Sequence, residues 1–340
     1  MNTLRVVLCL LLVLLTAGCG EDAPLPHADP LAVSDSVIDE LYAANPGPHA
    51  QSVIRDLLLA GDSDQRDITL NVYFPAQGEA FPLLLFSHGN WSDKDSYDRI
   101  IEHWVSHGYA VIAPNHLDCC SAVQGIFNSL RYGQLGLITG RVDDLSRVLD
   151  ELPAIEAMAP TFAGKSNSAK LAVTGHSFGA FSAQQFGGAG AFDPDTERYL
   201  LNRDPRVKAI VAMSPPGPMF DTITAGSWQQ LQTPTLVSTG TWDVQPTFWP
   251  DWRSHLLSWE TAIPGDKYAL VTQGADHYLG NLICRTERDA TPQTDALRMV
   301  QIGTTAFLDA YLKGNTNARA FLEGETLAVQ TAGFSRLDTR

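Results

Sequence analysis

Short runs of apolar residues recur along most of the chain. The run Pro-Leu-Leu-Leu-Phe-Ser at 82–87 is nearly all apolar, which is typical of a strand covered on both faces. Two earlier segments, 53–59 and 67–74, are rich in β-forming residues and are expected to form an opening hairpin. Further short apolar runs that predict strands lie at 109–113, 170–174, 209–213, 235–238 and 268–272.

Segments with helical spacing lie between these runs. In 142–152 apolar residues recur every three or four positions, and 97–106 and 296–312 show the same stripe. The segment 180–186 also suits a helix. Strands that alternate with helices predict an α/β fold with a mostly parallel, doubly wound central sheet flanked by helices. In such sheets function lies at the carboxyl ends of the strands.

The first residues predict export. Arg5 precedes the apolar run 6–15, which is shorter than the about 20 residues that a membrane-spanning helix needs. We therefore interpret it as a signal peptide. The small residues that follow end in Cys19 and resemble a bacterial lipobox, with Thr16 where Leu is usual. The alternative is an ordinary signal peptide cleaved nearby, with an unmodified cysteine.

These features predict the organisation of the chain. We expect a lipoprotein signal peptide at 1–18, a Pro-, Ala- and Asp-rich tether at 19–48 and a single domain at 49–340. Lipid on Cys19 would anchor the domain to the membrane of the cell envelope, at the outer membrane or its periplasmic face, with extracellular release as a variant. The net charge of −15 argues against a nucleic-acid partner.

Cysteines give one further expectation. Cys9 leaves with the signal and Cys19 carries lipid, so Cys119, Cys120 and Cys284 remain. Export permits disulfides, and we expect Cys284 to pair with Cys119 or Cys120 because both segments follow strands that end at one edge of the sheet. The alternative is three reduced, buried thiols. The spacing of the cysteines and histidines predicts no metal site.

A possible nucleophile lies between a predicted strand and a predicted helix. The sequence Gly175-His176-Ser177-Phe178-Gly179 follows the strand at 170–174 and precedes the helix at 180–186. This is the strand–turn–helix setting that the G-x-S-x-G motif requires. The sharp turn exposes the hydroxyl of Ser177, and glycine at 175 and 179 avoids collision with the neighbouring elements. We expect Ser177 to be the nucleophile.

A serine hydroxyl needs a base, and the base needs an acid that orients it. In this fold the acid and then the histidine follow the serine along the chain. His277 lies just after the strand at 268–272, whereas His255 falls in a helical stretch and is interpreted as packing or surface. Asp243 lies just after the strand at 235–238 and is the expected acid, with Asp221 in reserve and Asp276 set aside.

Acyl transfer also needs donors for the developing oxyanion. The backbone N–H of Phe178, directly after the nucleophile, is one expected donor. The N–H of Asn90, in the loop after the strand at 82–87, is the other. His88 is expected to brace that loop, and Trp91 beside it is expected to contact substrate.

Four segments carry a family resemblance. They are Phe86-Ser87-His88-Gly89, Arg141-Val142-Asp143-Asp144, Gly175-His176-Ser177-Phe178-Gly179 and Gly274-Ala275-Asp276-His277. Over about 53–322 the chain resembles the α/β-hydrolase superfamily, and more narrowly its bacterial platelet-activating factor acetylhydrolase-like and predicted dienelactone hydrolase-like serine esterases. The resemblance implies an α/β-hydrolase fold, a Ser-Asp-His triad, hydrolysis of carboxylic esters and no cofactor. Dienelactone hydrolases use a cysteine nucleophile where this chain has Ser177, so lactone specificity is not carried over.

Aromatic residues gather between the expected acid and base. One interpretation is a wall or lid for an apolar acyl or aromatic group, with Trp242 contacting substrate. The other is that they pack a surface helix onto the core. The residues are Trp242, Phe248, Trp249, Trp252 and Trp259.

The sequence therefore predicts an exported serine hydrolase that cleaves carboxylic esters through an acyl-enzyme. Its partners would be small-molecule, lipid or polymer ester substrates, and the membrane through the lipid on Cys19. A phospholipid acetylhydrolase or polyesterase of the same fold is one alternative. A lipid-anchored binding protein that has lost catalysis is another.

Overall fold

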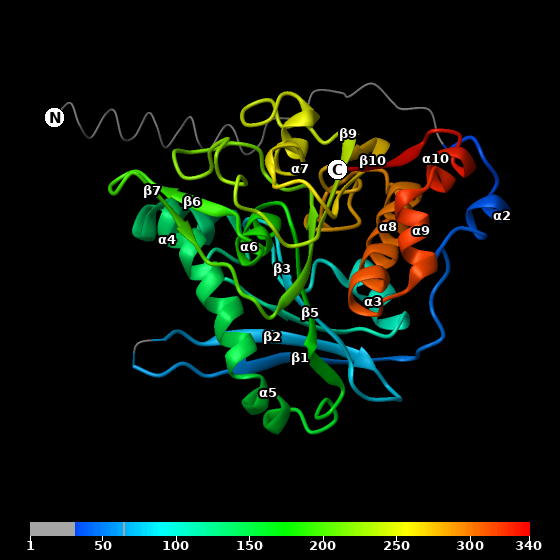
Figure 1. Ribbon diagram of the computed structural model, residues 1–340. Helices are drawn as coiled ribbons and strands as arrows, with labels where there is room; N and C mark the ends of the chain where they lie inside the picture. The colour runs from blue at the N-terminus through cyan, green and yellow to red at the C-terminus, as the bar shows by residue number, and fades with distance from the viewer. Residues whose placement is uncertain (1–30, 64) are drawn as a thin grey trace. The chain divides into compact units, whose positions relative to one another are not determined.

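A nine-stranded, mostly parallel sheet forms the centre of the protein (Figure 1). The structure is a computed structural model, and it describes residues 31–63 and 65–340. In sheet order the strands are β1 (Gln51–Leu59), β2 (Ile68–Pro75), β4 (Ala110–Pro114), β3 (Phe81–Ser87), β5 (Ser166–His176), β8 (Val207–Met213), β9 (Thr235–Trp242), β10 (Lys267–Asp276) and β11 (Ser335–Thr339).

The six strands from β4 to β10 pair in parallel, and β1, β2 and β11 add antiparallel pairs at the edges. With helices on its flanks, this sheet is an α/β-hydrolase fold, as the sequence predicted. The opening hairpin of β1 and β2 is confirmed as well.

Two hydrophobic clusters, one on each face of the sheet, explain why the central strands are apolar without alternation. Successive side chains of a strand point to opposite faces. In β3, Leu84 and Phe86 belong to one cluster, whereas Leu83 and Leu85 belong to the other. All four are fully buried. A strand buried on both sides has no polar face, which is the pattern from which these strands were predicted.

Helices cover both faces (Figure 1). On one face α3 (Asp98–Ser106) and α8 (Thr294–Leu312) supply the side chains of the first cluster. On the other, α4 (Ala122–Asp150), α5 (Leu152–Met158) and α6 (Phe178–Phe186) pack against the second. The smaller elements are α2 (Asp35–Ile38), β6 (Gly190–Asp193), β7 (Arg198–Leu201), the 3-10 helix η1 (Trp252–Leu256), α7 (Leu257–Thr261), α9 (Thr316–Glu323) and α10 (Thr326–Gln330).

Some elements differ from the prediction for identifiable reasons. Helix α4 begins twenty residues before the expected 142–152 segment, and it bends at Gly133, which has a φ of 68°. Its first part exposes Val123, Phe127 and Leu130, so no apolar stripe faces the core there. Strand β11 is short and polar and lies at the edge of the sheet, where most of its side chains are only partly buried. It therefore has no apolar run from which it could be predicted.

The expected leader lies outside the described residues. The signal peptide at 1–18 and the lipid on Cys19 therefore stay predictions. Of the segment predicted as a tether, residues 31–48 are described, and they place Ile38 and Leu41 in the first hydrophobic cluster. Within the described residues, no helix is both long enough and apolar enough to cross a membrane.

The predicted pairing of Cys284 is wrong. Cys119 and Cys120 are bonded to each other, and Cys284 is a free, buried thiol. Cys284 belongs to the hydrophobic cluster on the side of α3 and α8, whereas Cys119 and Cys120 precede α4 on the other side. The sequence placed the two segments at the correct edge of the sheet, but strand order does not show on which face each cysteine lies.

We expect peptide mapping without reduction to find this arrangement. Alkylation of the unfolded, unreduced chain should modify Cys284, because its thiol is free, and should leave Cys119 and Cys120 unmodified. The same map reads the mature N-terminus, which the lipidation prediction places at Cys19. A disulfide-linked peptide that contains Cys284 would contradict the assignment.

Replacing Gly179 with alanine should destabilise the fold. A Cβ at this position would overlap the carbonyl oxygens of Ser87 and His88, which are backbone atoms and cannot turn aside. Overpacking of this kind typically costs about 1–3 kcal/mol in the free energy of unfolding. Gly140→Ala in α4 is the control, since a Cβ there meets nothing within 4 Å. Urea unfolding that gives both variants the same stability would refute this.

Candidate active site

Ser177 lies in the sharp turn between β5 and α6. Its φ of 55° is in the left-handed region, which is unusual for a residue other than glycine and is often found at functional sites. Its backbone N–H donates to the carbonyl oxygen of Met213, 2.8 Å away, at the end of the neighbouring strand β8. A Cβ at Gly175 would overlap the backbone of Gly179, so the two glycines permit the turn to close.

The structure brings the three expected triad side chains together from the ends of β5, β9 and β10. The Nε2 of His277 lies 2.9 Å from the Oγ of Ser177, and its Nδ1 lies 2.7 Å from Oδ1 of Asp243. The carboxylate accepts at Nδ1, so the tautomer that fits protonates Nδ1 and leaves Nε2 free to accept from the serine hydroxyl. Thr239 donates to the other carboxylate oxygen, at 2.9 Å.

The two alternative acids have other positions. The carboxylate of Asp276 accepts from the backbone N–H groups of Tyr278 and Gly280, at 2.9 and 2.8 Å. It therefore shapes the loop that carries His277. Asp221 is exposed and lines a hollow at the surface.

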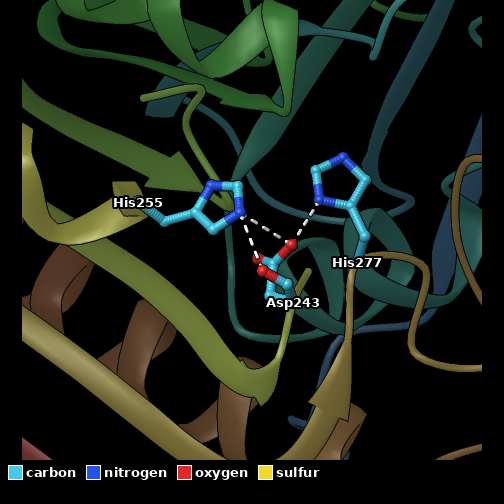
Figure 2. A group of neighbouring side chains, drawn as sticks. All are labelled: Asp243, His255 and His277. Atoms are coloured by element: carbon cyan, nitrogen blue, oxygen red, sulfur yellow. Dashed lines mark hydrogen bonds and ion pairs between the residues drawn. The ribbon is translucent and has the colours of Figure 1, made fainter. Parts of the chain in front are cut away.

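His255 is the residue that the sequence interpretation missed. It lies in η1, is fully buried, and places Nε2 3.0 Å from the same oxygen of Asp243 that His277 contacts (Figure 2). Its Nδ1 lies 2.6 Å from the carbonyl oxygen of Pro215. The sequence could have indicated a role for His255, since His255 and His277 are the two histidines that follow Ser177.

The side chains in Figure 2 form a hydrogen-bonded chain. The ligand atoms of Asp243, His255 and His277 all lie within 4.8 Å of one another, close enough to raise the question of a metal ion. However, every ring nitrogen of the two histidines already has a hydrogen-bond partner in the protein. At His277 the chain continues to the hydroxyl of Ser177.

The two expected oxyanion donors lie in suitable settings. Phe178 begins α6, and the first N–H groups of a helix have no acceptor within it. Asn90 follows Gly89, whose carbonyl oxygen lies 3.2 Å from Nη2 of Arg141 and 2.7 Å from Nδ1 of His88. In a trans peptide the carbonyl and the next N–H point in opposite directions, so the N–H of Asn90 points away from Arg141.

Arg141 is a buried support for this loop. Its guanidinium forms two bonds to the carboxylate of Asp118, at 2.9 and 2.7 Å, and one to the carbonyl oxygen of His88, at 2.6 Å. It also lies over the ring of Phe178, 4.8 Å from the centroid. One side chain thus contacts both segments that carry the expected oxyanion donors.

Arg285 binds the next two carbonyl groups of the loop after β3, which follow that of Gly89. Its guanidinium donates to the carbonyl oxygens of Asn90 and Trp91, each at 3.3 Å. The ring of His88 also braces the loop, since its Nε2 accepts from the backbone N–H of His116. The loop is therefore fixed largely through its carbonyl groups.

His176 links the loop to the base. The N–H of Gly89 donates to the hydroxyl of Tyr97, at 2.8 Å, and that hydroxyl lies 3.0 Å from Nδ1 of His176. The other ring nitrogen lies 2.8 Å from the carbonyl oxygen of His277. Burial lowers the pKa of His176 to about 3, so the ring is neutral. It accepts from Tyr97 and donates to His277.

The aromatic cluster divides into two groups. Trp252 and Trp259 pack against the second hydrophobic cluster, as the core interpretation expected. Trp249 instead stacks on His277, with ring centroids 6.1 Å apart. Phe248 contacts Trp249 and Phe220, and both phenylalanines are nearly half exposed.

A surface hollow of about 640 Å³ is lined by Phe220, the last ring of this row. The two tryptophans expected to contact substrate are not members of this row. The ring of Trp91 packs against Gly125 of α4, and Trp242 ends β9 opposite Asp276 of β10. Phe248 and Trp249 belong to the cluster that the sequence interpreted as a possible wall or lid, whereas Phe220 was not singled out.

Removing Arg141 should destabilise the protein strongly. Arg141→Met leaves the buried carboxylate of Asp118 without its partner, which costs about 3–5 kcal/mol in the free energy of unfolding. Arg131→Met, in the exposed part of the same helix, should change stability by no more than about 0.5 kcal/mol. Replacing both Arg141 and Asp118 with apolar residues should recover much of the loss. Urea unfolding measures all three, and equal stability of the two single variants would contradict the role.

Part of the chain is similar to a family of known proteins. Residues 48–188 match the chlorophyllase family, and no curated protein matches the chain. The match covers less than half of the chain. It includes the loop after β3 and Ser177, and it ends before Asp243 and His277. Together with the α/β-hydrolase fold, the similarity supports a carboxylic ester hydrolase in general terms.

Proposed function

We propose that the protein is a serine hydrolase that cleaves carboxylic esters through an acyl-enzyme intermediate. One observation carries the proposal: Ser177 Oγ, His277 and Asp243 form a continuous hydrogen-bonded chain, with steps of 2.9 and 2.7 Å. The left-handed backbone at Ser177 supports it, because such strain persists where the surrounding structure enforces it.

In the first half of the reaction, Oγ of Ser177 forms a bond to the ester carbonyl carbon while its proton moves to Nε2 of His277. The carbonyl oxygen becomes an oxyanion that accepts from the N–H groups of Phe178 and Asn90. Asp243 stabilises the imidazolium. The bond to the alcohol oxygen then breaks, and Nε2 returns its proton to the departing alcohol.

In the second half, water attacks the acyl-enzyme. Nε2 of His277 accepts a proton from the water as its oxygen bonds to the acyl carbon. Collapse of the second tetrahedral intermediate breaks the bond to Oγ, and the serine regains its proton from the imidazolium. Acid product and free enzyme result, and the protons balance without a cofactor.

The surroundings of the base favour esters with a bulky apolar or aromatic group. Trp249, Phe248 and Phe220 form a continuous row of ring contacts from His277 to the surface hollow. Apolar and aromatic linings are typical of ligand sites. The similarity to chlorophyllases, which are named for an ester of a large ring system, agrees with this substrate class.

We further propose that the enzyme acts at the cell envelope, anchored by lipid on Cys19. The support is the apolar run at 6–15 and the small residues that precede the cysteine. The mature N-terminus read in the peptide map tests this proposal.

A fluorophosphonate probe should label the wild type at Ser177. Ser177→Ala should lose the label, and ester hydrolysis should fall by about 10⁴-fold or more, because the nucleophile is gone. The matched control is Ser182→Ala in α6, which removes a buried hydroxyl bonded to the carbonyl of Phe178 and keeps the nucleophile. A folded wild type that neither takes the label nor hydrolyses p-nitrophenyl esters would instead favour a binding protein.

A further inference from the structure

His255 faces hydrogen-bond acceptors with both of its ring nitrogens. Nδ1 lies 2.6 Å from the carbonyl oxygen of Pro215. Nε2 lies 3.0 Å from Oδ1 of Asp243 and 3.1 Å from the backbone carbonyl oxygen of the same residue. Carbonyl and carboxylate oxygens accept but do not donate, so both nitrogens need a proton. The geometry therefore requires an imidazolium at this position.

The contrast with His176 shows that burial alone does not decide the charge. Both rings are fully buried. His176 has a hydroxyl at one nitrogen, which can donate to it, so a neutral ring satisfies all its bonds. His255 has no such donor among its partners. Although burial disfavours the cation, the neighbouring carboxylate of Asp243 outweighs burial and raises the pKa of His255.

The titratable groups that face His255 come from three strand ends. They are Asp243 after β9, His277 after β10 and His176 at the end of β5. Of these three, Asp243 is the acid, and burial alone would raise its pKa. The two histidines on its carboxylate outweigh burial and hold the pKa well below the ordinary value. A buried carboxylate is thereby paired with a buried cation before His277 takes up any proton.

We propose that His255 is a positioning residue of the triad, which as an imidazolium holds the carboxylate of Asp243 in place for His277. This inference rests on the proposed function. His255 fixes Oδ1, Thr239 fixes Oδ2, and the carboxylate cannot rotate away from Nδ1 of His277. The ring of His255 lies near that of His277, with the two ring centroids 5.8 Å apart.

Two amide substitutions separate this role from a merely structural one. The amide nitrogen of glutamine can take the place of Nε2, so His255→Gln keeps a donor to Asp243 and loses the one to Pro215. His255→Asn does the reverse, because its amide nitrogen takes the place of Nδ1. We expect kcat to fall about 10–100-fold in H255N, with KM nearly unchanged, and to fall less in H255Q. A larger loss in H255Q would overturn the proposal in favour of the Pro215 contact. Urea unfolding of both variants establishes that activity is compared between folded proteins.

The protonation state can be read without substrate or activity. In the wild type labelled with ¹⁵N-histidine, NMR at pH 8 should show one ring with both nitrogens protonated, and that signal should be absent from H255Q. A wild-type spectrum in which every ring keeps an unprotonated nitrogen would overturn the proposal even if neither amide variant folds. Loss of the proposed function is recognised separately, by a wild type that fluorophosphonate does not label.

Discussion

The close approach of α6 to the end of β3 is the constraint on which the site depends. Gly179 leaves no room for a side chain against the carbonyl groups of Ser87 and His88. This contact sets the start of α6 beside the loop after β3, and it holds Ser177 in its left-handed conformation between them. The two expected oxyanion donors, at Phe178 and Asn90, therefore lie on the two sides of one backbone contact.

Positively charged side chains support this arrangement. Arg141 and Arg285 occupy the carbonyl groups of the loop, and His255 occupies the carboxylate of Asp243. The arginines bind carbonyl oxygens of the loop, so the N–H groups of the loop stay available to the substrate. His255 binds the carboxylate of Asp243, which in turn orients the imidazole of His277. The protein carries a net charge of −15, so these cations oppose the sign of the molecule as a whole.

The sequence was sufficient for the features that depend on local order. The central strands are buried on both faces and hence apolar throughout, so their positions could be predicted. Ser177, Asp243 and His277 were each found from their place beside a strand end, and the structure brings the three side chains together. The contacts of His255 could not be predicted, because they depend on how η1 folds back over β9. The predicted disulfide partner of Cys284 was wrong for a similar reason, because strand order does not show on which face of the sheet a cysteine lies. Strand β11 is polar and lies at the edge, so it had no apolar run.

The bridge from Gly89 through Tyr97 and His176 to His277 has a consequence for sequence variation. His176 occupies the first variable position of the G-x-S-x-G motif, directly before the nucleophile. Its ring accepts a hydrogen bond from the hydroxyl of Tyr97 and donates one to the carbonyl oxygen of His277, so few other residues could replace it. A relative that replaces Tyr97 with phenylalanine would leave one nitrogen of that ring without a donor. Positions 97 and 176 should therefore change as a pair during evolution.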